Sequence, residues 1–138
     1  MSNAAIMPTL PDIPPSIISP FDLAMTLPAL WVAHDRIDAA LLGLRGKPYE
    51  DGHREMRALE GRIEAVEELA LESPARSLAD ALAQQVLLLP RIEDEFDLPC
   101  MARTFAGGLR VLLPMCKADF SELLKHYAPY LMSSEFDV

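Results

Sequence analysis

The chain has 138 residues, a length typical of one domain with one hydrophobic core. Hydrophobic residues make up 51% and charged residues 24%, as in globular proteins, and no apolar run approaches the roughly 18 residues that a membrane span requires. The formal net charge is −9, and such a surface repels phosphate backbones and anionic lipid heads. Composition therefore argues against a membrane protein and against nucleic acid as a partner.

The two cysteines and the N-terminal residues indicate the cellular compartment in which the protein is expected. Cys100 and Cys116 are the only cysteines, too few for a disulfide framework and too far apart for a Cys-x-x-Cys redox or zinc pair. We expect both to be buried thiols. The first twenty residues contain no basic leader, and prolines interrupt their apolar stretches, so no secretory signal is visible. These features predict a cytoplasmic protein.

Residues 1–19 predict a Pro-rich, extended N-terminal arm. Each of the four prolines in this range removes a backbone donor and favours extended geometry in the residue before it. The arm is too apolar for a free tail, and its expected anchors on the rest of the protein are Ile6, Leu10, Ile13, Ile17 and Ile18. We expect it to lie over the broad apolar face of Leu87, Leu88 and Leu89. Residues 20–138 then form the helical domain.

A long helical hairpin follows the arm. From Leu27 onward, apolar residues recur at alternating steps of four and three, the pattern of a helix that packs at a shallow angle, until Arg45–Pro48 ends it. A second helix repeats the pattern from about Tyr49 or Asp51 to Glu72. The connection is only about six to eight residues long, and short connections make neighbouring helices antiparallel. The two helices are therefore expected to share one apolar seam.

The third helix is expected between two local signals. Ser77 followed by Asp80 is a variant of the capping box, which satisfies the free N–H groups at a helix start. The apolar spacing continues to Leu89, and Pro90 is expected to end the helix because proline lacks the N–H donor and clashes with the preceding turn.

Two further helices complete the expected fold. Asp97 can cap a fourth helix with Pro99 in its first turn, and its Gly107-Gly108 pair predicts a closely packed neighbouring backbone. Asp119 can cap a short last helix that ends before Pro129. No stretch alternates convincingly with period two. The sequence therefore predicts an all-α, single-domain bundle of four to five helices built on the hairpin.

The middle of the chain resembles a set of short helical proteins of unknown function from alphaproteobacteria. In these proteins a tryptophan-bearing helix leads to an acidic helix and then to a Pro-Ala-x-Thr-Leu-Ala-Gly segment. The matching residues cover about half of the chain and are Trp31, His34, Asp38, Glu60, Ile63 and Ser73-Pro74-Ala75-Arg76-Ser77-Leu78-Ala79. The pattern continues with Gly and later Lys, where this chain has Asp80 and Gln84. The resemblance implies a helical-hairpin fold and a bacterial origin, and it assigns no activity.

His34 is the most distinctive candidate site residue, because every other position in its seam is apolar. Asp38 lies one turn along the same helix, and Glu60 is expected across the seam. We interpret the three as a structural polar cluster, since a part-buried imidazole needs hydrogen-bond partners and a carboxylate supplies them. The alternative is a divalent metal site, which one imidazole and two carboxylates could form.

Two pairs of acids suggest a different chemistry. Glu64-x-x-Glu67 and Asp94-x-x-Asp97 superficially resemble the paired motifs of all-α nucleoside triphosphate pyrophosphohydrolases, in which four carboxylates hold magnesium. That pattern requires a Glu leading the second pair and a helix that carries it without a proline break. A solvated acidic face explains the same residues.

The sequence thus favours a non-catalytic protein-protein interaction or regulatory module that self-associates, with no catalytic residues, cofactor or metal. The alternative is a small metal-dependent phosphohydrolase of the pyrophosphohydrolase type.

Overall fold

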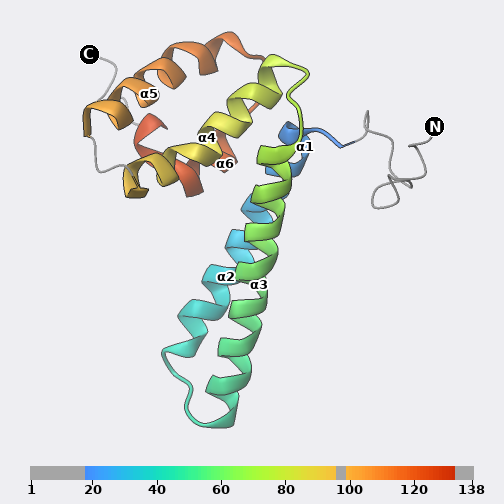
Figure 1. The fold of residues 1–138 in the computed structure, drawn as a ribbon. Helices are drawn as coiled ribbons and strands as arrows, with labels where there is room; N and C mark the ends of the chain where they lie inside the picture. The colour runs from blue at the N-terminus through green and yellow to red at the C-terminus, as the bar shows by residue number, and fades with distance from the viewer. Residues whose placement is uncertain (1–17, 96–98, 133–138) are drawn as a thin grey trace, which may run out of the picture.

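The computed structural model describes residues 18–95 and 99–132, and in these ranges the chain is all-α, as predicted. Figure 1 shows two long antiparallel helices that extend from one side of a group of shorter helices. The elements in chain order are α1 (Pro20–Ala24), α2 (Leu27–Leu41), α3 (Lys47–Glu72), α4 (Leu78–Glu95), α5 (Pro99–Leu112), the 3₁₀ turn η2 (Leu113–Met115), α6 (Ser121–Tyr127) and the 3₁₀ turn η3 (Pro129–Met132).

The predicted hairpin is present as α2 and α3, which pack side by side along their length (Figure 1). Its turn is earlier and tighter than expected, because α2 ends at Leu41 and α3 begins at Lys47. Pro48 lies in the first turn of α3, where its missing N–H costs no hydrogen bond. Gly46 precedes it with a φ of 66°, a backbone conformation that side chains disfavour. Pro48 therefore marks the start of the second helix of the hairpin and not the end of the first.

The expectation that Pro90 ends the third helix was wrong, since α4 continues through Pro90 to Glu95. Contacts on both sides of the proline hold the helix together. Leu87 and Leu89 are buried in the core before it, and Arg91 forms ion pairs with α3 after it. These tertiary contacts offset the hydrogen bond that an internal proline removes.

A single core cluster joins α4 to the helices around it. Leu82, Val86 and Leu89 of α4 are fully buried, and they pack with Leu109 of α5 and Leu123 of α6. We call this part, α1 and α4 to α6, the head. The buried residues Leu27, Ile63 and Ala70 carry the core into the adjoining ends of α2 and α3. In the described part of the chain, no helix is long and apolar enough to cross a membrane.

Two local expectations failed in the head. Added Cβ atoms at Gly107 and Gly108 would meet no atom within 4 Å, so no close backbone explains this pair. Cys100 is exposed and Cys116 is half-buried, so neither is the fully buried thiol that was expected. Asp119 does support the start of α6, where its Oδ1 accepts hydrogen bonds from the Ser121 N–H and hydroxyl at 2.9 and 2.7 Å.

Candidate functional site

A polar cluster lies where α2, α3, α4 and α6 meet, and Tyr127 is at its centre. The indole N–H of Trp31 donates to the Tyr127 hydroxyl oxygen at 3.0 Å, and that hydroxyl donates in turn to Glu67. Burial raises the pKa of Tyr127 above its usual range, and the bond to the Glu67 carboxylate raises it further. The hydroxyl therefore stays protonated and joins three helices through two hydrogen bonds.

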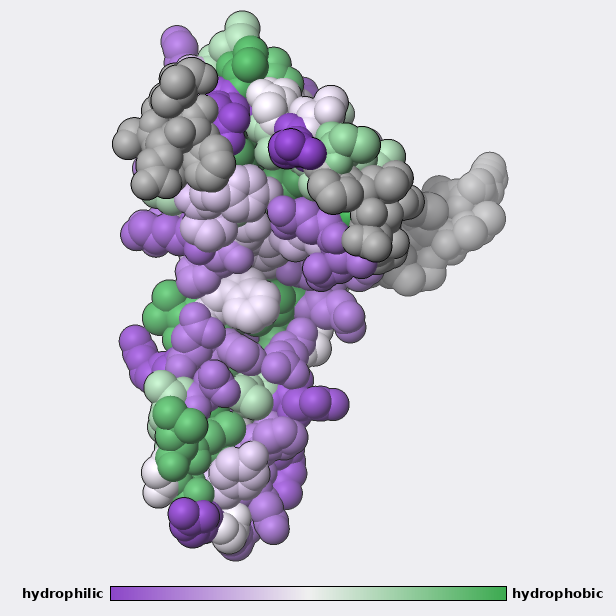
Figure 2. Space-filling view, turned by 90° about the vertical axis from the view of Figure 1, so that its left-hand side faces the viewer, coloured by the Kyte–Doolittle hydropathy of each residue, from purple (hydrophilic) through white to green (hydrophobic). Residues whose placement is uncertain are grey.

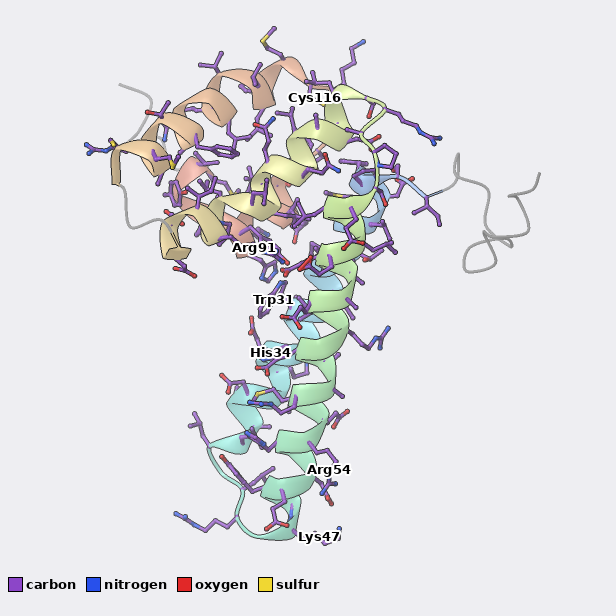
Figure 3. The ribbon with its side chains drawn as sticks, viewed as in Figure 1. Trp31, His34, Lys47, Arg54, Arg91 and Cys116 are labelled. Atoms are coloured by element: carbon purple, nitrogen blue, oxygen red, sulfur yellow. The ribbon has the colours of Figure 1, made fainter. Side chains whose placement is uncertain are left out.

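Arg91 of α4 completes this cluster. Its guanidinium lies 3.5 Å from a Glu67 oxygen and 3.3 Å from a Glu68 oxygen. Figure 3 shows Arg91 and Trp31 on the same side of the molecule, where the head meets the hairpin. Glu67 is thus shared between a phenol and a guanidinium, and its side chain is 16% exposed. Such a satisfied network fixes the angle between the head and the hairpin.

His34 and Glu60, two of the three predicted cluster residues, are in contact. His34 Nε2 lies 2.9 Å from Glu60 Oε2, which joins α2 to α3. The second ring nitrogen lies 3.3 Å from Asp35 and not beside Asp38, which is exposed on the helix surface. The bond to Glu60 is the main cause that raises the pKa of His34, and Asp35 adds to it. The His34 ring also meets the edge of Trp31, with 5.3 Å between ring centroids.

The acidic and histidine side chains of the two alternative readings are placed as follows. In residues 18–95 and 99–132, no three side chains among His, Cys, Asp and Glu come together as a metal site. Of the acids in the alternative reading, Glu64 and Asp94 are exposed, and Glu67 is engaged by Tyr127 and Arg91. Asp97 lies outside the described residues. The polar groups at the junction bind one another, which is the behaviour of a structural network.

Asp80 forms a second network that the sequence foreshadowed only in part. Its backbone N–H donates to Ser77 Oγ at 3.0 Å, which is the predicted cap. Asp80 is only 3% exposed, and its carboxylate does not accept the Ser77 N–H as a full capping box would require. It accepts the N–H of Phe21 at 3.1 Å and the N–H of Arg76 at 2.9 Å, so it ties α1 to the turn before α4.

Gln84 of α4 supports the same turn. Its amide donates to the carbonyl oxygens of Ala70 at 2.9 Å and Ser73 at 2.6 Å, which have no partner within α3 itself. Asp80 and Gln84 together hold the end of α3, the start of α4 and α1 in one place. Both side chains therefore have a structural role.

The predicted arm is largely outside the described residues, which include none of Ile6, Leu10, Ile13 and Ile17. Ile18 is half-buried and lines a cleft of about 320 Å³ with Phe21, Pro74 and Asp80 among others. In the expected docking face, Leu87 and Leu89 are only 2% and 0% exposed and belong to the core cluster with residues of α5 and α6, whereas Leu88 is half-buried.

The free part of the hairpin, residues 32–62, is here called the stalk. The structure describes all of these residues, and Leu41 is the only buried one among them. Ile37, Met56 and Leu59 of the seam are only half-buried and lie outside the core cluster. In Figure 2, hydrophilic side chains cover much of one side of the stalk, with hydrophobic atoms near its free end, where Leu42 is 90% exposed. The stalk is therefore an open two-helix surface.

Sequence reasoning missed Tyr127 and Arg91 as partners of Glu67. The available signal was the phenol on the buried side of the last helix, because a buried Tyr hydroxyl requires a hydrogen-bond partner. Nothing local indicated which partner, since Glu67 and Tyr127 are 60 residues apart.

No family model matches this chain, and no curated protein or solved structure shows a significant similarity to it.

Proposed function

We propose that this protein is a non-catalytic protein-interaction module that self-associates through its stalk. The observation that carries the proposal is the exposure of the stalk, in which Leu41 alone is buried over residues 32–62. The head has its own core, whereas the stalk extends from it with only one seam between two helices (Figure 1).

Physical reasons favour a covering partner. Most of the stability of a helix in a protein comes from packing of its apolar face, and a pair of helices covers only part of each face. Ile37, Met56 and Leu59 keep part of their apolar surface in water. Two such hairpins that pack together form a four-helix bundle, which covers all four faces.

The polar junction supports a non-catalytic role. Trp31, Tyr127, Glu67 and Arg91 bond to one another, and this fixes the stalk rigidly on the head. A rigid, preorganised stalk loses little conformational entropy when it binds, which favours association. The net charge of −9 disfavours nucleic acids and anionic lipid surfaces as partners.

Sedimentation equilibrium of the full chain over a wide concentration range tests the proposal. We expect a reversible dimer that Leu59→Glu weakens at least ten-fold, because it places a charge in the apolar interface. The matched control is Val111→Glu, which introduces the same charge at an apolar position of the head that is 66% exposed. A monomer at every concentration, or a dimer that only Val111→Glu disrupts, would contradict the proposal.

A further inference from the structure

The stalk has two long edges with different chemistry. His34 and Glu60 mark the first edge, which lies on the same side as Trp31, the residue that contacts the head (Figure 3). On the second edge, helical spacing brings together Ala33, Ile37 and Ala40 from α2 and Glu55, Leu59 and Arg62 from α3. This second edge, defined by those six residues, points away from the Trp31–Tyr127 contact.

The second edge suits close packing against another helix pair. Ile37 and Leu59 are half-buried, and they provide apolar surface outside the core cluster of the head. Ala33 and Ala40 flank Ile37, and their small side chains allow a second backbone to approach closely. The edge is thus apolar along its centre.

Opposite charges border this apolar centre. Glu55 and Arg62 are seven residues apart on α3, and neither has an ion-pair partner anywhere in the described residues. By contrast, Asp51 is paired with Lys47 and Arg54, and Glu60 is paired with His34 and Arg57. Glu55 and Arg62 are therefore available to an external partner.

We propose that the partner on the second edge is another copy of this chain, with its stalk antiparallel to the first. This inference rests on the proposed function and specifies its geometry. A two-fold axis across the stalk places α3 against α3 of the second copy and α2 against α2. Glu55 then meets Arg62 of the second copy, Arg62 meets its Glu55, and Ala33 faces its Ile37.

A parallel pair does not use these charges. A two-fold axis along the stalk places α3 on α2 of the second copy at the same height, as the His34–Glu60 pair defines it. Glu55 would then lie level with Ala39 and Ala40, and Arg62 level with Val32 and Ala33. All four positions are neutral, so both charges would stay unpaired.

The charge along α3 and its flanking residues favours the same orientation. Residues 63–75, at the head end, contain four acids and no base, namely Glu64, Glu67, Glu68 and Glu72. Arg91 offsets part of that charge. Residues 45–57, at the free end, contain four bases and three acids. An antiparallel pair brings each acidic end to the basic end of the other copy, whereas a parallel pair brings the two acidic ends together.

A spin-label distance decides the orientation. Lys47 lies at the free end of the stalk, and its side chain is 82% exposed (Figure 3). Lys47→Cys is labelled in a Cys100→Ser/Cys116→Ser background whose sedimentation matches that of the unmodified chain. At 1.5 Å per residue, an antiparallel dimer centred between Glu55 and Arg62 separates the two labels by about 35 Å, and a parallel dimer holds them within about 20 Å.

Charge exchange provides the second test. Glu55→Arg or Arg62→Glu alone should weaken dimerisation about ten-fold at low salt, because each places two like charges face to face at two symmetric positions. The double variant Glu55→Arg/Arg62→Glu should restore the affinity. The matched control is Glu50→Arg, which makes the same charge change at an exposed position outside the second edge and should not weaken dimerisation.

The outcomes separate the two proposals. A long label distance with rescue by the double variant supports the antiparallel dimer. A dimer with a short distance, or one that Glu55→Arg leaves unchanged, overturns the antiparallel geometry and keeps self-association through the stalk. A chain that is monomeric throughout, or one whose Leu59 and Glu55 variants only lose binding to a different protein, overturns both.

Discussion

The indole nitrogen of Trp31 lies 3.0 Å from the hydroxyl oxygen of Tyr127, although the two residues are 96 positions apart in the chain. This hydrogen bond joins the second helix to the last α-helix, and the onward bond from Tyr127 to Glu67 includes α3. The contact makes the hairpin and the head one unit.

Removal of the Tyr127 hydroxyl tests the importance of this contact. Tyr127→Phe leaves the Trp31 N–H and one Glu67 oxygen without their partner in a partly buried site, so we expect a loss of about 1–3 kcal/mol in the free energy of unfolding. Urea unfolding followed by the fluorescence of Trp31, the only tryptophan, measures it. The control is Tyr49→Phe, because Tyr49 is 42% exposed and only stacks on His53. Equal stability of both variants would show that the junction contributes little.

The Asp80 network predicts that a single substitution, Asp80→Asn, lowers the free energy of unfolding substantially. Asp80→Asn replaces a charged acceptor of two backbone N–H groups with an amide that presents only one oxygen, and we expect a loss of about 2–3 kcal/mol in unfolding free energy. Asp38→Asn, at an exposed position of α2, should change stability by less than about 0.5 kcal/mol. Denaturant titrations of the two variants compare the sites, and equal effects would contradict a structural role for the buried carboxylate.

The His34–Glu60 pair predicts how stability depends on pH. The pKa of His34 is raised above 6.5 in the folded protein, so the folded state holds the imidazole proton more tightly than the unfolded state does. The resulting stabilisation is complete below about pH 6.5 and is lost as the pH rises through the higher folded pKa. His34→Gln should remove this part of the pH dependence, whereas His53→Gln on the same stalk should retain it. Parallel pH profiles for His34→Gln and the unmodified chain would exclude the pair as the cause.

The glycine pair in α5 predicts stabilising substitutions. Gly107→Ala and Gly108→Ala add a Cβ that meets no atom within 4 Å, and each removes backbone freedom from the unfolded chain. Each should raise the unfolding free energy by up to about 1 kcal/mol. Thermal melts of the two variants measure the gain. A lower melting temperature would reveal a contact at this helix face that only an assembly supplies.

Magnesium distinguishes the interaction module from the alternative hydrolase. Four carboxylates that hold an ion would make magnesium raise the melting temperature, and a nucleoside triphosphate would be hydrolysed. We expect neither effect, and we expect a chelator to leave the melting temperature unchanged. Triphosphate hydrolysis that disappears in Glu64→Gln would instead support the hydrolase. Exposed Glu64 is the better probe, because Glu67→Gln also disturbs the bond to Tyr127.

Periodicity and capping signals were sufficient for the all-α class and the antiparallel hairpin, because these depend on residues three to seven positions apart. The same local logic located the cap at Ser77 and predicted His34 and Glu60 as partners, since a short turn leaves little freedom in register. It failed at Pro90, where distant contacts outweigh the local cost of proline.

Only the tertiary structure decided how the head and the hairpin meet. Glu67 lies 60 residues from its partner Tyr127, and Phe21 lies 59 residues from its partner Asp80, and no local pattern encodes which buried donor will reach which acceptor. The sequence by itself determined which faces are apolar. The three-dimensional packing decided that the face of Leu87 and Leu89 is covered within the chain, because α5 and α6 bury it, whereas the stalk extends beyond the head and keeps its seam half-exposed.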